Sequence, residues 1–243
     1  GFQRKLGDKI TFGSEIVSIR QTTENVKVAY KNTKTGAMKE VTADYCVSCL
    51  PLIVLSKLDV NLSAETMAAV KATPYSPNAK MGLQMKRRFW EEDDRIFGGH
   101  LYSNLPFGDF AYPSGGLFGN KGVLLGFYGN GRTAGAVDMP IKGRIEHVLT
   151  HASKVHPQIR AEYETGYCVW WEKVQYSLGA TAGGAGAAAA DRLAVLGKPD
   201  GRIFLGCAAV SGNGGWQEGA VSAAWKQVRQ LHERVMTTTG QTA

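Results

Sequence analysis

The chain has 243 residues, 44% of them hydrophobic, so it can bury a sizeable core and is not a disordered tail. Its net charge of +7 permits contact with anions, but the one basic cluster, MKRRFW (85–90), is followed directly by EEDD. We interpret this stretch as solvated and salt-bridged rather than as a nucleic-acid patch, and no apolar run reaches the roughly 20 residues of a membrane span.

The first part of the chain has the pattern of a small β-meander. Residues 10–30 contain two alternating strand patterns around a polar turn, and EVTADYCVSCLP (40–51) is a third strand that becomes fully apolar. Cys46 and Cys49 stand three apart in that strand, on opposite faces, so we expect them neither to pair nor to bind zinc. The opening GFQRKLGDKI has no initiator Met and no signal-like region, which predicts a fragment or a processed subunit.

The middle of the chain alternates helix and strand signals. Ser63 is expected to cap a helix that begins at the next residue. Residues 79–90 alternate like a strand, and GVLLGFYGNG (122–131) predicts a buried strand. Residues 138–156 predict a helix whose apolar stripe contains Ile141, Ile145, Val148 and Leu149.

The five histidines show no metal spacing with acidic residues. His147 and His151 stand one helical turn apart, and without a third ligand we expect them at the surface.

The last part of the chain predicts a strand, a glycine-rich loop and a long helix. Residues 179–192 predict a loop with a short helical end, and GRIFLG (201–206) a short strand beside DYCVSCLP. SGNGG (211–215) leads into an amphipathic helix over 216–235, and the tail 237–243 is expected to fray.

Three long segments carry a family resemblance: PNAKMGLQMKRRFWEEDDRIFGGH with LPFGDFAYPS after it, WWEKVQYSLGA, and PDGRIFLGCAAVSGNGGWQEGAVSAA. They resemble the flavin-dependent amine oxidase superfamily and, within it, the L-amino-acid oxidases. The resemblance covers nearly the whole chain. It implies an α/β fold of mixed α+β type, the C-terminal part of a two-domain FAD-binding protein. Residues 1–50 and 196–236 would belong to the FAD-binding domain, and 51–195 would form a mixed-sheet substrate-binding domain.

The resemblance also implies the cofactor and the partners. FAD would be non-covalent, because Ala180 stands where some amine oxidases carry the cysteine that bonds to the flavin. This chain lacks the family's dinucleotide loop and its carboxylate-binding arginine, so an N-terminal half is an expected partner. The other expected partners are a small-molecule amino acid or amine and O2, with a homodimer left open. No nucleic-acid partner and no membrane span are expected.

The helix that begins near Trp216 is implied to meet the flavin. In the family this N-terminus faces the pyrimidine edge of the ring, where unpaired N–H groups stabilise the negative charge of the reduced flavin. The alternative is an ordinary helix with a core tryptophan. Ile16 matches a backbone position that meets the adenine, with Val17 beside it as a core residue. The implied cofactor-binding residues are Ile16, Trp171, Tyr176, Gly206, Ala208, Gly215, Trp216, Gln217, Glu218 and Ala220.

Lys80 is the implied catalytic residue. From the sequence alone it would be an edge lysine; the matching family lysine holds a water near flavin N5 and favours electron transfer to O2. Tyr128 matches a tyrosine that binds the substrate carboxylate, its alternative being a core aromatic. Gly215 would offer its carbonyl to the substrate amine, and Trp216 would form one wall of the substrate cage. Many relatives have a second aromatic wall where Thr181 stands, so the cage is expected to be open there.

The resemblance implies an oxidase that removes a hydride from the α-carbon of an L-amino acid, giving a 2-oxo acid, ammonia and hydrogen peroxide. Two alternatives remain open: an amine or polyamine oxidase, and an incomplete fragment that folds with the missing half. Relatives carry an acidic residue where Ala208 stands, which predicts weaker FAD binding.

Overall fold

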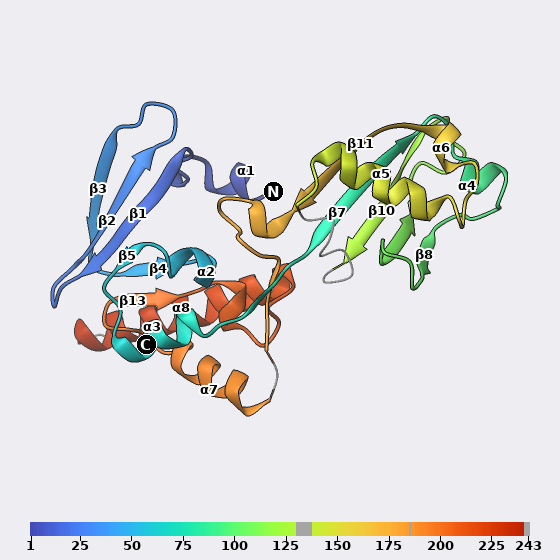
Figure 1. Ribbon diagram of the computed structural model, residues 1–243. Helices are drawn as coiled ribbons and strands as arrows, with labels where there is room; N and C mark the ends of the chain where they lie inside the picture. Colours follow the sequence, from blue (N-terminus) through green and yellow to red (C-terminus); the bar gives the residue numbers. More distant parts are fainter. Residues whose placement is uncertain (130–137, 185, 241–243) are drawn as a thin grey trace. The chain divides into compact units, whose positions relative to one another are not determined.

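The computed structural model describes residues 1–129, 138–184 and 186–240 (Figure 1). The chain divides into a terminal unit, made of Gly1–Tyr75 and the chain from Ala182 onward, and a central unit, Ser76–Thr181. These divisions differ from the expected boundaries at 50/51 and 195/196. The assignment of FAD binding and substrate binding to the two parts stays a prediction. No helix among the described residues is long and apolar enough to cross a membrane.

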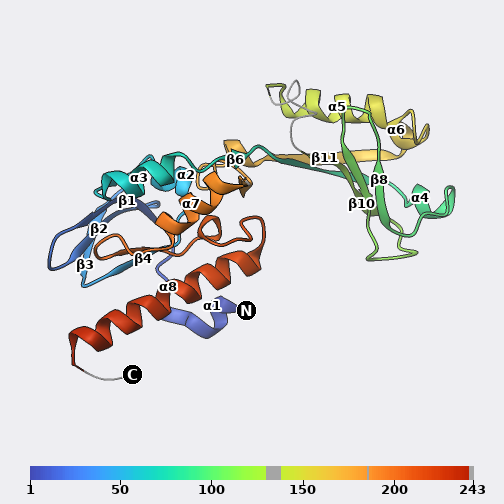
Figure 2. The same cartoon turned by 90° about the horizontal axis from the view of Figure 1, so that it is seen from below.

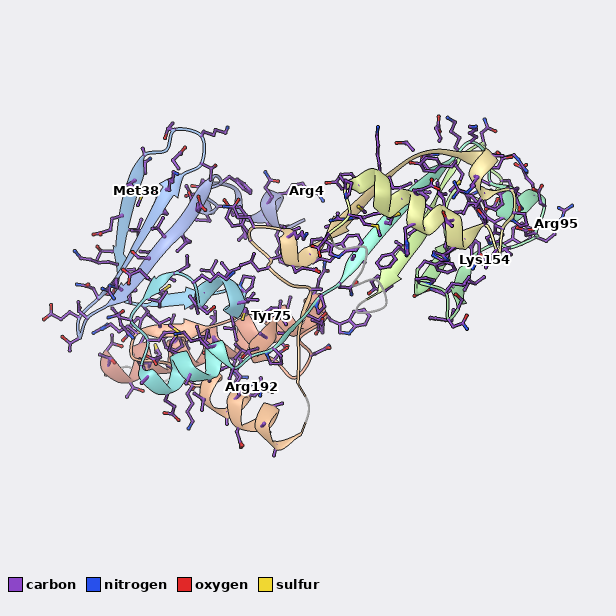
Figure 3. All side chains as sticks on the ribbon, viewed as in Figure 1. Arg4, Met38, Tyr75, Arg95, Lys154 and Arg192 are labelled. Carbon is purple, nitrogen blue, oxygen red and sulfur yellow. The ribbon has the colours of Figure 1, made fainter. Side chains whose placement is uncertain are left out.

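The terminal unit begins with the predicted meander. It forms a four-stranded sheet of order β3-β2-β1-β5, antiparallel except that β5 runs parallel to β1. Met38 on β3 is exposed (Figure 3). A short helix and a 3-10 turn precede the sheet. The bounds are α1 (Phe2–Leu6), η1 (Gly7–Lys9), β1 (Ser14–Gln21), β2 (Val26–Asn32), β3 (Met38–Ala43) and β5 (Asp59–Val60).

Two expectations for this region were wrong in detail. Residues 40–51 hold two strands, because the chain bends between β3 and β4 (Cys46–Ser48), and β4 joins a different sheet. Val17 is not a core residue: it is 39% exposed, because the register between β1 and β2 shifts between Ile16 and Ser18. A bulge of this kind leaves the extra residue unpaired.

A second, two-stranded sheet carries the long C-terminal helix. β13 (Ile203–Leu205) pairs in parallel with β4, so the predicted pairing of GRIFLG with DYCVSCLP is confirmed. All three residues of β13 are buried, as expected of a parallel strand covered on both faces. Helix α8 (Gln217–Thr238), the long red helix in Figure 2, contacts both strands.

The remaining helices of the terminal unit are short. The predicted N-cap is confirmed, since the Ser63 hydroxyl accepts the Thr66 N–H at 3.2 Å. The helical end predicted for 179–192 is also present. The tail begins later than expected, because Thr237 and Thr238 still belong to α8; residues 241–243 lie outside the described residues. The bounds are α2 (Leu52–Leu55), α3 (Ala64–Lys71), α7 (Ala187–Leu196) and η4 (Ala208–Val210).

The central unit is a five-stranded sheet of order β11-β7-β10-β9-β8, and its strand pairs are antiparallel rather than mixed. The mixed α/β class is confirmed for the chain as a whole, with the mixed sheet in the terminal unit. The strands of this sheet are β7 (Ala79–Met85), β8 (Gly99–Tyr102), β9 (Asp109–Tyr112), β10 (Gly122–Gly129) and β11 (Tyr163–Trp170). The helices are α4 (Phe89–Glu92), α5 (Ile141–Ala152), α6 (Ile159–Glu162) and the 3-10 turn η3 (Trp171–Lys173). The two-residue strands β6 (Tyr75–Ser76) and β12 (Thr181–Ala182) pair with each other in a separate sheet.

One face of this sheet packs on α5. Alternate residues of β7 are buried, as the predicted period of two requires, and they share a core with Ile145, Val148 and Leu149 of α5. Ile141, the first residue of the predicted stripe, is 46% exposed, because the helix begins there and its first turn reaches past the core.

The basic and acidic cluster at 85–94 was expected to be solvated. This expectation was wrong for Arg88 and Glu91, which are buried. Arg88 donates from Nε to Glu91 Oε1 at 2.7 Å, and each side chain is 3% exposed. Arg88 also donates to the carbonyls of Pro113 and Gly115. The pair is buried because α4 places the two residues three apart on one turn, beside the buried Trp90. The hydrogen bond from Arg88 holds the pKa of Glu91 below its usual value.

Candidate functional site

Lys80 and Tyr128 lie side by side on the central sheet. They are cross-strand partners on β7 and β10, and Lys80 Nζ lies 4.8 Å from the centroid of the Tyr128 ring. That is a cation–π distance. The Lys80 side chain is exposed, and among the described residues no carboxylate lies within salt-bridge distance of its ammonium group. The ammonium is therefore a cation held against an aromatic ring, on an exposed residue of the sheet.

Trp171 lies at the same end of the sheet. It follows β11, where Val169 pairs with Lys80, and its N–H donates to the carbonyl of Asn78 at 3.0 Å, just before β7 begins. The structure therefore brings Lys80, Tyr128 and Trp171 together at adjoining ends of three strands.

The other two predicted residues of the central unit lie further along the chain. Tyr176 is 52% exposed and follows η3. Thr181 belongs to β12, and its carbonyl accepts the Ser76 hydroxyl at 3.4 Å.

The first turn of α8 is open in the terminal unit. Trp216 is the N-cap residue and is 72% exposed, and no side chain caps the helix. Gln217 and Glu218 are exposed as well, while Ala220 donates its N–H to the Trp216 carbonyl. A helix start of this kind presents backbone donors and the positive end of the helix dipole.

Glycines allow the preceding loop to pack directly against this turn. A Cβ at Gly219 would lie 2.0 Å from the Asn213 carbonyl oxygen and 2.6 Å from Ser211 Oγ. A Cβ at Gly214 would lie 2.6 Å from the carbonyl oxygen of Ala182. Only glycine fits at such close approaches. The uncapped backbone donors of this exposed turn fit the electron-rich pyrimidine edge of a flavin, and the glycines allow the close packing of the loop beneath it.

Gly206 and Ala208 lie just before that loop. Gly206 is buried, and its N–H donates to the Ser48 carbonyl at 2.9 Å. Ala208 is half-buried in η4, and its carbonyl accepts the Ser211 hydroxyl at 2.8 Å. The Ser211 hydroxyl is thus bound within its own loop. Ile16, by contrast, is half-buried on β1 and packs against the core of the terminal unit.

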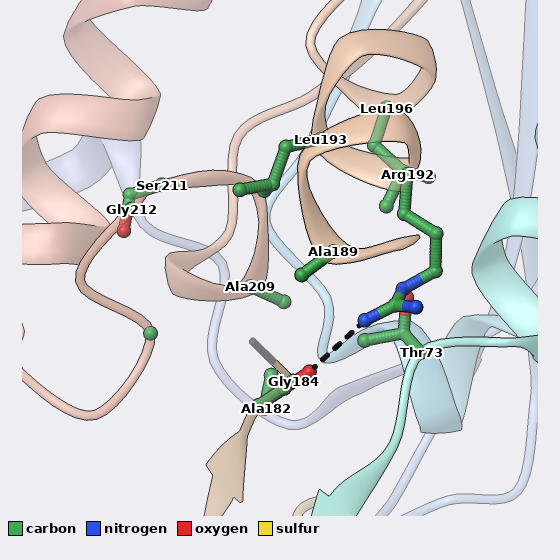
Figure 4. Close-up of a pocket in the computed structure, with 12 residues that line it drawn as sticks. Thr73, Ala182, Gly184, Ala189, Arg192, Leu193, Leu196, Ala209, Ser211 and Gly212 are labelled. Atoms are coloured by element: carbon green, nitrogen blue, oxygen red, sulfur yellow. Dashed lines mark hydrogen bonds between the residues drawn. The ribbon is translucent and has the colours of Figure 1, made fainter. Parts of the chain in front are cut away.

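A cavity of about 90 Å³ lies beside the same loop (Figure 4). Arg192 lines it and donates to the Gly183 carbonyl at 3.4 Å. The cavity has room for several water molecules but not for a dinucleotide. It is lined by residues of α7, residues 182–184 and the loop at 209–214.

Sequence reasoning missed a hydrogen-bonded chain in the central unit that runs from the buried Tyr112 and His156 to the exposed Asp94. The Tyr112 hydroxyl lies 2.6 Å from His156 Nε2, and His156 Nδ1 lies 2.9 Å from Asp94 Oδ2. Burial lowers the pKa of His156, against the opposing effect of Asp94, and burial raises the pKa of Tyr112 to about 12. A neutral His156 therefore accepts from Tyr112 and donates to Asp94. No spacing in the sequence signals this chain, because its members are far apart.

The cysteines and histidines form no metal site within the described ranges, where no cluster of three His, Cys, Asp or Glu side chains could hold an ion. The four cysteines are free thiols. Burial raises the pKa values of Cys46 and Cys207, so these thiols are held in the neutral form.

The family model of flavin containing amine oxidoreductase matches residues 2–232. The chain belongs to this family. The assignment supports FAD as the cofactor, and the residues at the start of α8 fit its ring edge.

Curated relatives and solved structures agree with the assignment. L-amino acid oxidase bordonein-L of Crotalus durissus terrificus is 27% identical over 179 residues, covering 70% of this chain and 34% of the relative. L-amino-acid oxidase of Bungarus fasciatus is 22% identical over 233 residues, covering 93% and 45%. Cyclohexylamine oxidase from Brevibacterium oxydans IH-35A superposes with a TM-score of 0.79 at 16% identity, covering 96% of this chain and 51% of that one. A cofactor-binding redesign of putrescine oxidase gives 0.80 at 16%, covering 95% and 51%.

The chain thus spans between a third and a half of the length of these curated relatives. The likeness to the solved structures shows the fold.

Proposed function

We propose that this chain is the C-terminal half of a flavin-dependent oxidase of L-amino acids. The observation that carries the proposal is the Lys80 ammonium, which has no carboxylate partner among the described residues and is held over Tyr128, in a chain of the flavin amine oxidoreductase family. Similarity to L-amino-acid oxidases over 70% to 93% of the chain supports the substrate class.

Each residue would then have one task. Bound FAD supplies the hydride acceptor and passes electrons to O2. The first turn of α8 would hold the pyrimidine edge of the ring through backbone N–H groups. Lys80 would place a positive charge where O2 accepts electrons, which stabilises the negative charge that develops there.

Three further residues would have tasks in substrate binding. The Tyr128 hydroxyl would donate to the substrate carboxylate, the Gly215 carbonyl would accept from the amine, and Trp216 would form an apolar wall. The substrate imine would be hydrolysed to a 2-oxo acid and ammonia, and O2 would be reduced to hydrogen peroxide as the third product. An N-terminal half would supply the dinucleotide loop and a guanidinium for the carboxylate.

A second candidate is an amine or polyamine oxidase. The solved structures that resemble this chain include a cyclohexylamine oxidase and a putrescine oxidase. The Tyr128 hydroxyl favours the amino acid, because an amine substrate has no carboxylate to accept its hydrogen bond.

The test uses the protein assembled with its N-terminal half. We expect absorbance peaks near roughly 370 and 450 nm from bound flavin, and hydrogen peroxide production from L-amino acids. Tyr128→Phe should lower kcat/KM for L-amino acids by about 10- to 100-fold, since hydrogen bonds to charged groups contribute about 1.5–3 kcal/mol. The matched control is a primary amine of the same side chain, whose turnover should not change. Faster turnover of the amine than of the amino acid by the unsubstituted enzyme would favour the second candidate, and a colourless assembled protein would contradict both.

A further inference from the structure

The cavity of the terminal unit has one charged side chain among the described residues that line it. The cavity lies between α7, residues 182–184 and the loop at 209–214 (Figure 4), and its volume is about 90 Å³. Arg192 supplies the charge, and no Asp, Glu, Lys or His belongs to the described lining. Small-molecule sites commonly combine apolar walls with a few placed polar groups. The apolar walls of this cavity are formed by Ala189, Leu193, Leu196 and Ala209.

Most donors of the Arg192 guanidinium have no protein partner among the described residues. A guanidinium has five N–H donors. Arg192 makes one hydrogen bond there, from Nη2 to the Gly183 carbonyl at 3.4 Å, and no described carboxylate lies within salt-bridge distance. Gly184 makes room for the group, because a Cβ at this position would overlap Nη2. The half-buried guanidinium is therefore held against residues 183–184 with donors to spare.

The hydroxyls of the described lining are already bonded, whereas two backbone donors are not. Thr73 and Ser211 donate to the carbonyls four and three residues before them, at 2.9 and 2.8 Å. No described residue accepts the N–H of Gly212 or of Gly214. The groups that lack a protein partner at this cavity are therefore hydrogen-bond donors, and a ligand would have to supply acceptors.

We propose that this cavity binds a short aliphatic carboxylate. A carboxylate only accepts hydrogen bonds, and it matches the fork of a guanidinium with two parallel ones. A short carbon chain suits walls of alanine and leucine. The volume limits the ligand to roughly six non-hydrogen atoms, if each takes the space of a buried water, about 15 Å³. Such a site does not require the proposed oxidase activity.

The site lies beside the loop that supports the first turn of α8. Gly214 lines the cavity, and Gly219 of α8 packs directly against the Asn213 carbonyl. A bound carboxylate would hold this loop through the N–H groups of Gly212 and Gly214. Because a ligand that binds only the folded state stabilises it by mass action, the carboxylate should also raise the Tm of the terminal unit.

The experiment titrates sodium propionate into the complete protein by isothermal titration calorimetry, with sodium chloride at the same ionic strength as the comparison. We expect saturable binding of propionate with a Kd on the order of 1 mM. Arg192→Met should raise the Kd by about 10- to 100-fold, because the charge-assisted hydrogen bonds are lost. Ala189→Leu should raise it by at least about 10-fold, because the larger side chain fills the cavity, and it tests the site if Arg192→Met does not fold.

The matched control is Arg229→Met, the same change at an exposed arginine of α8 in the same unit. Its Kd should stay within about twofold of the unsubstituted protein. Tyr128→Phe separates the cavity from the proposed substrate site, which would also take a carboxylate. This variant should leave the Kd of the cavity unchanged.

Four results would overturn the inference: no saturable binding of propionate, a Kd that neither Arg192→Met nor Ala189→Leu raises, chloride binding as tight as that of propionate, or binding that Tyr128→Phe alone abolishes. Propionate binding that depends on Arg192, in a protein that does not oxidise L-amino acids, would keep the carboxylate site and refute the proposed function.

Discussion

The central unit holds its candidate site residues on a sheet with a continuous core, and we call it the closed unit. The terminal unit has its candidate flavin edge at an uncapped helix start, and we call it the open unit. The core of the central unit runs from Ala79 to Trp170 and joins the sheet to α5 and to the segment around Trp90. The terminal unit buries β13 completely, yet it exposes Trp225 on α8 and has an uncapped helix start. Lys80 and Tyr128 therefore lie on a sheet whose core is formed within the central unit, whereas the proposed flavin edge lies at the exposed first turn of α8 in the terminal unit.

The largest expected effect concerns the buried ion pair of Arg88 and Glu91 in the central unit. Arg88→Met leaves the Glu91 carboxylate buried, with one remaining hydrogen bond from the Phe118 N–H. Removing one member of a buried ion pair is strongly destabilising, because it leaves an uncompensated charge. We expect the Tm of the central unit to fall by roughly 10 to 20 °C in a calorimetric scan.

Lys121→Met is the control for that change, because Lys121 pairs with Glu164 at 2.7 Å with its side chain 54% exposed. Exposed pairs contribute little, so its Tm should move by no more than about 3 °C. An equal fall in Tm for the two substitutions would show that the Arg88–Glu91 pair contributes no more to the stability of the central unit than an exposed pair.

The second prediction tests whether Lys80, on the closed unit, takes part in the reaction of the reduced flavin with O2. In the assembled enzyme, Lys80→Met should slow reoxidation of the reduced flavin by O2 about 100-fold, since an oriented charge near developing charge contributes on that order. Flavin reduction by the substrate should change by less than about threefold. Stopped-flow absorbance measures both half-reactions, and Lys86→Met, whose Nζ donates to the Ala161 carbonyl, is the control. If both half-reactions slow equally, Lys80 has a structural role.

The sequence predicted features that depend on local signals better than features that depend on contacts between distant residues. Elements with local signals were predicted correctly: the Ser63 cap, the alternation of β7 and the start of α8 near Trp216. The neighbouring positions of β13 and β4 were also predicted, because GRIFLG was expected to return beside DYCVSCLP after a long excursion of the chain; their parallel direction comes from the structure.

Features made by contacts between distant residues were not predictable in this way. The burial of Arg88 depends on the carbonyls of a loop 25 residues or more away, and the bulge that exposes Val17 depends on the register of β1 with β2. The Lys80–Tyr128 contact needed the register of β7 with β10, which only the structure provides. Family resemblance named both residues, but not their cation–π contact.

The third prediction concerns the open unit. Ala208→Glu should tighten FAD binding about 10- to 100-fold in the assembled enzyme, since an acid that accepts cofactor hydroxyl bonds contributes roughly 1–3 kcal/mol. Ser211 is a poor substitute, because its Oγ already accepts the Asn213 N–H at 3.0 Å while its hydroxyl donates to the Ala208 carbonyl. Flavin fluorescence quenching during titration of both apo forms measures the Kd. Unchanged affinity would mean that another group already accepts the ribityl hydroxyls.

The smallest expected effect is a pH dependence confined to the closed unit. Burial lowers the folded-state pKa of His156 below its ordinary value of 6.5, although Asp94 opposes that shift. The unfolded chain therefore takes up a proton at a pH where the folded chain resists it, so stability is full above about pH 6.5 and falls as the pH drops toward the folded pKa.

We expect the Tm of the central unit to fall by a few degrees between pH 7.5 and pH 5.5, and His156→Gln to reduce that fall. His151→Gln provides the necessary comparison, because desolvation and the nearby His147 also lower the pKa of His151. If only His151→Gln flattens the profile, the hydrogen-bonded chain from Tyr112 to Asp94 does not determine the acid response of this unit. If neither does, a group other than these histidines determines the response, and it is not Glu91 or Asp93, because arginines lower the pKa values of these carboxylates and their contribution is lost only below this pH range.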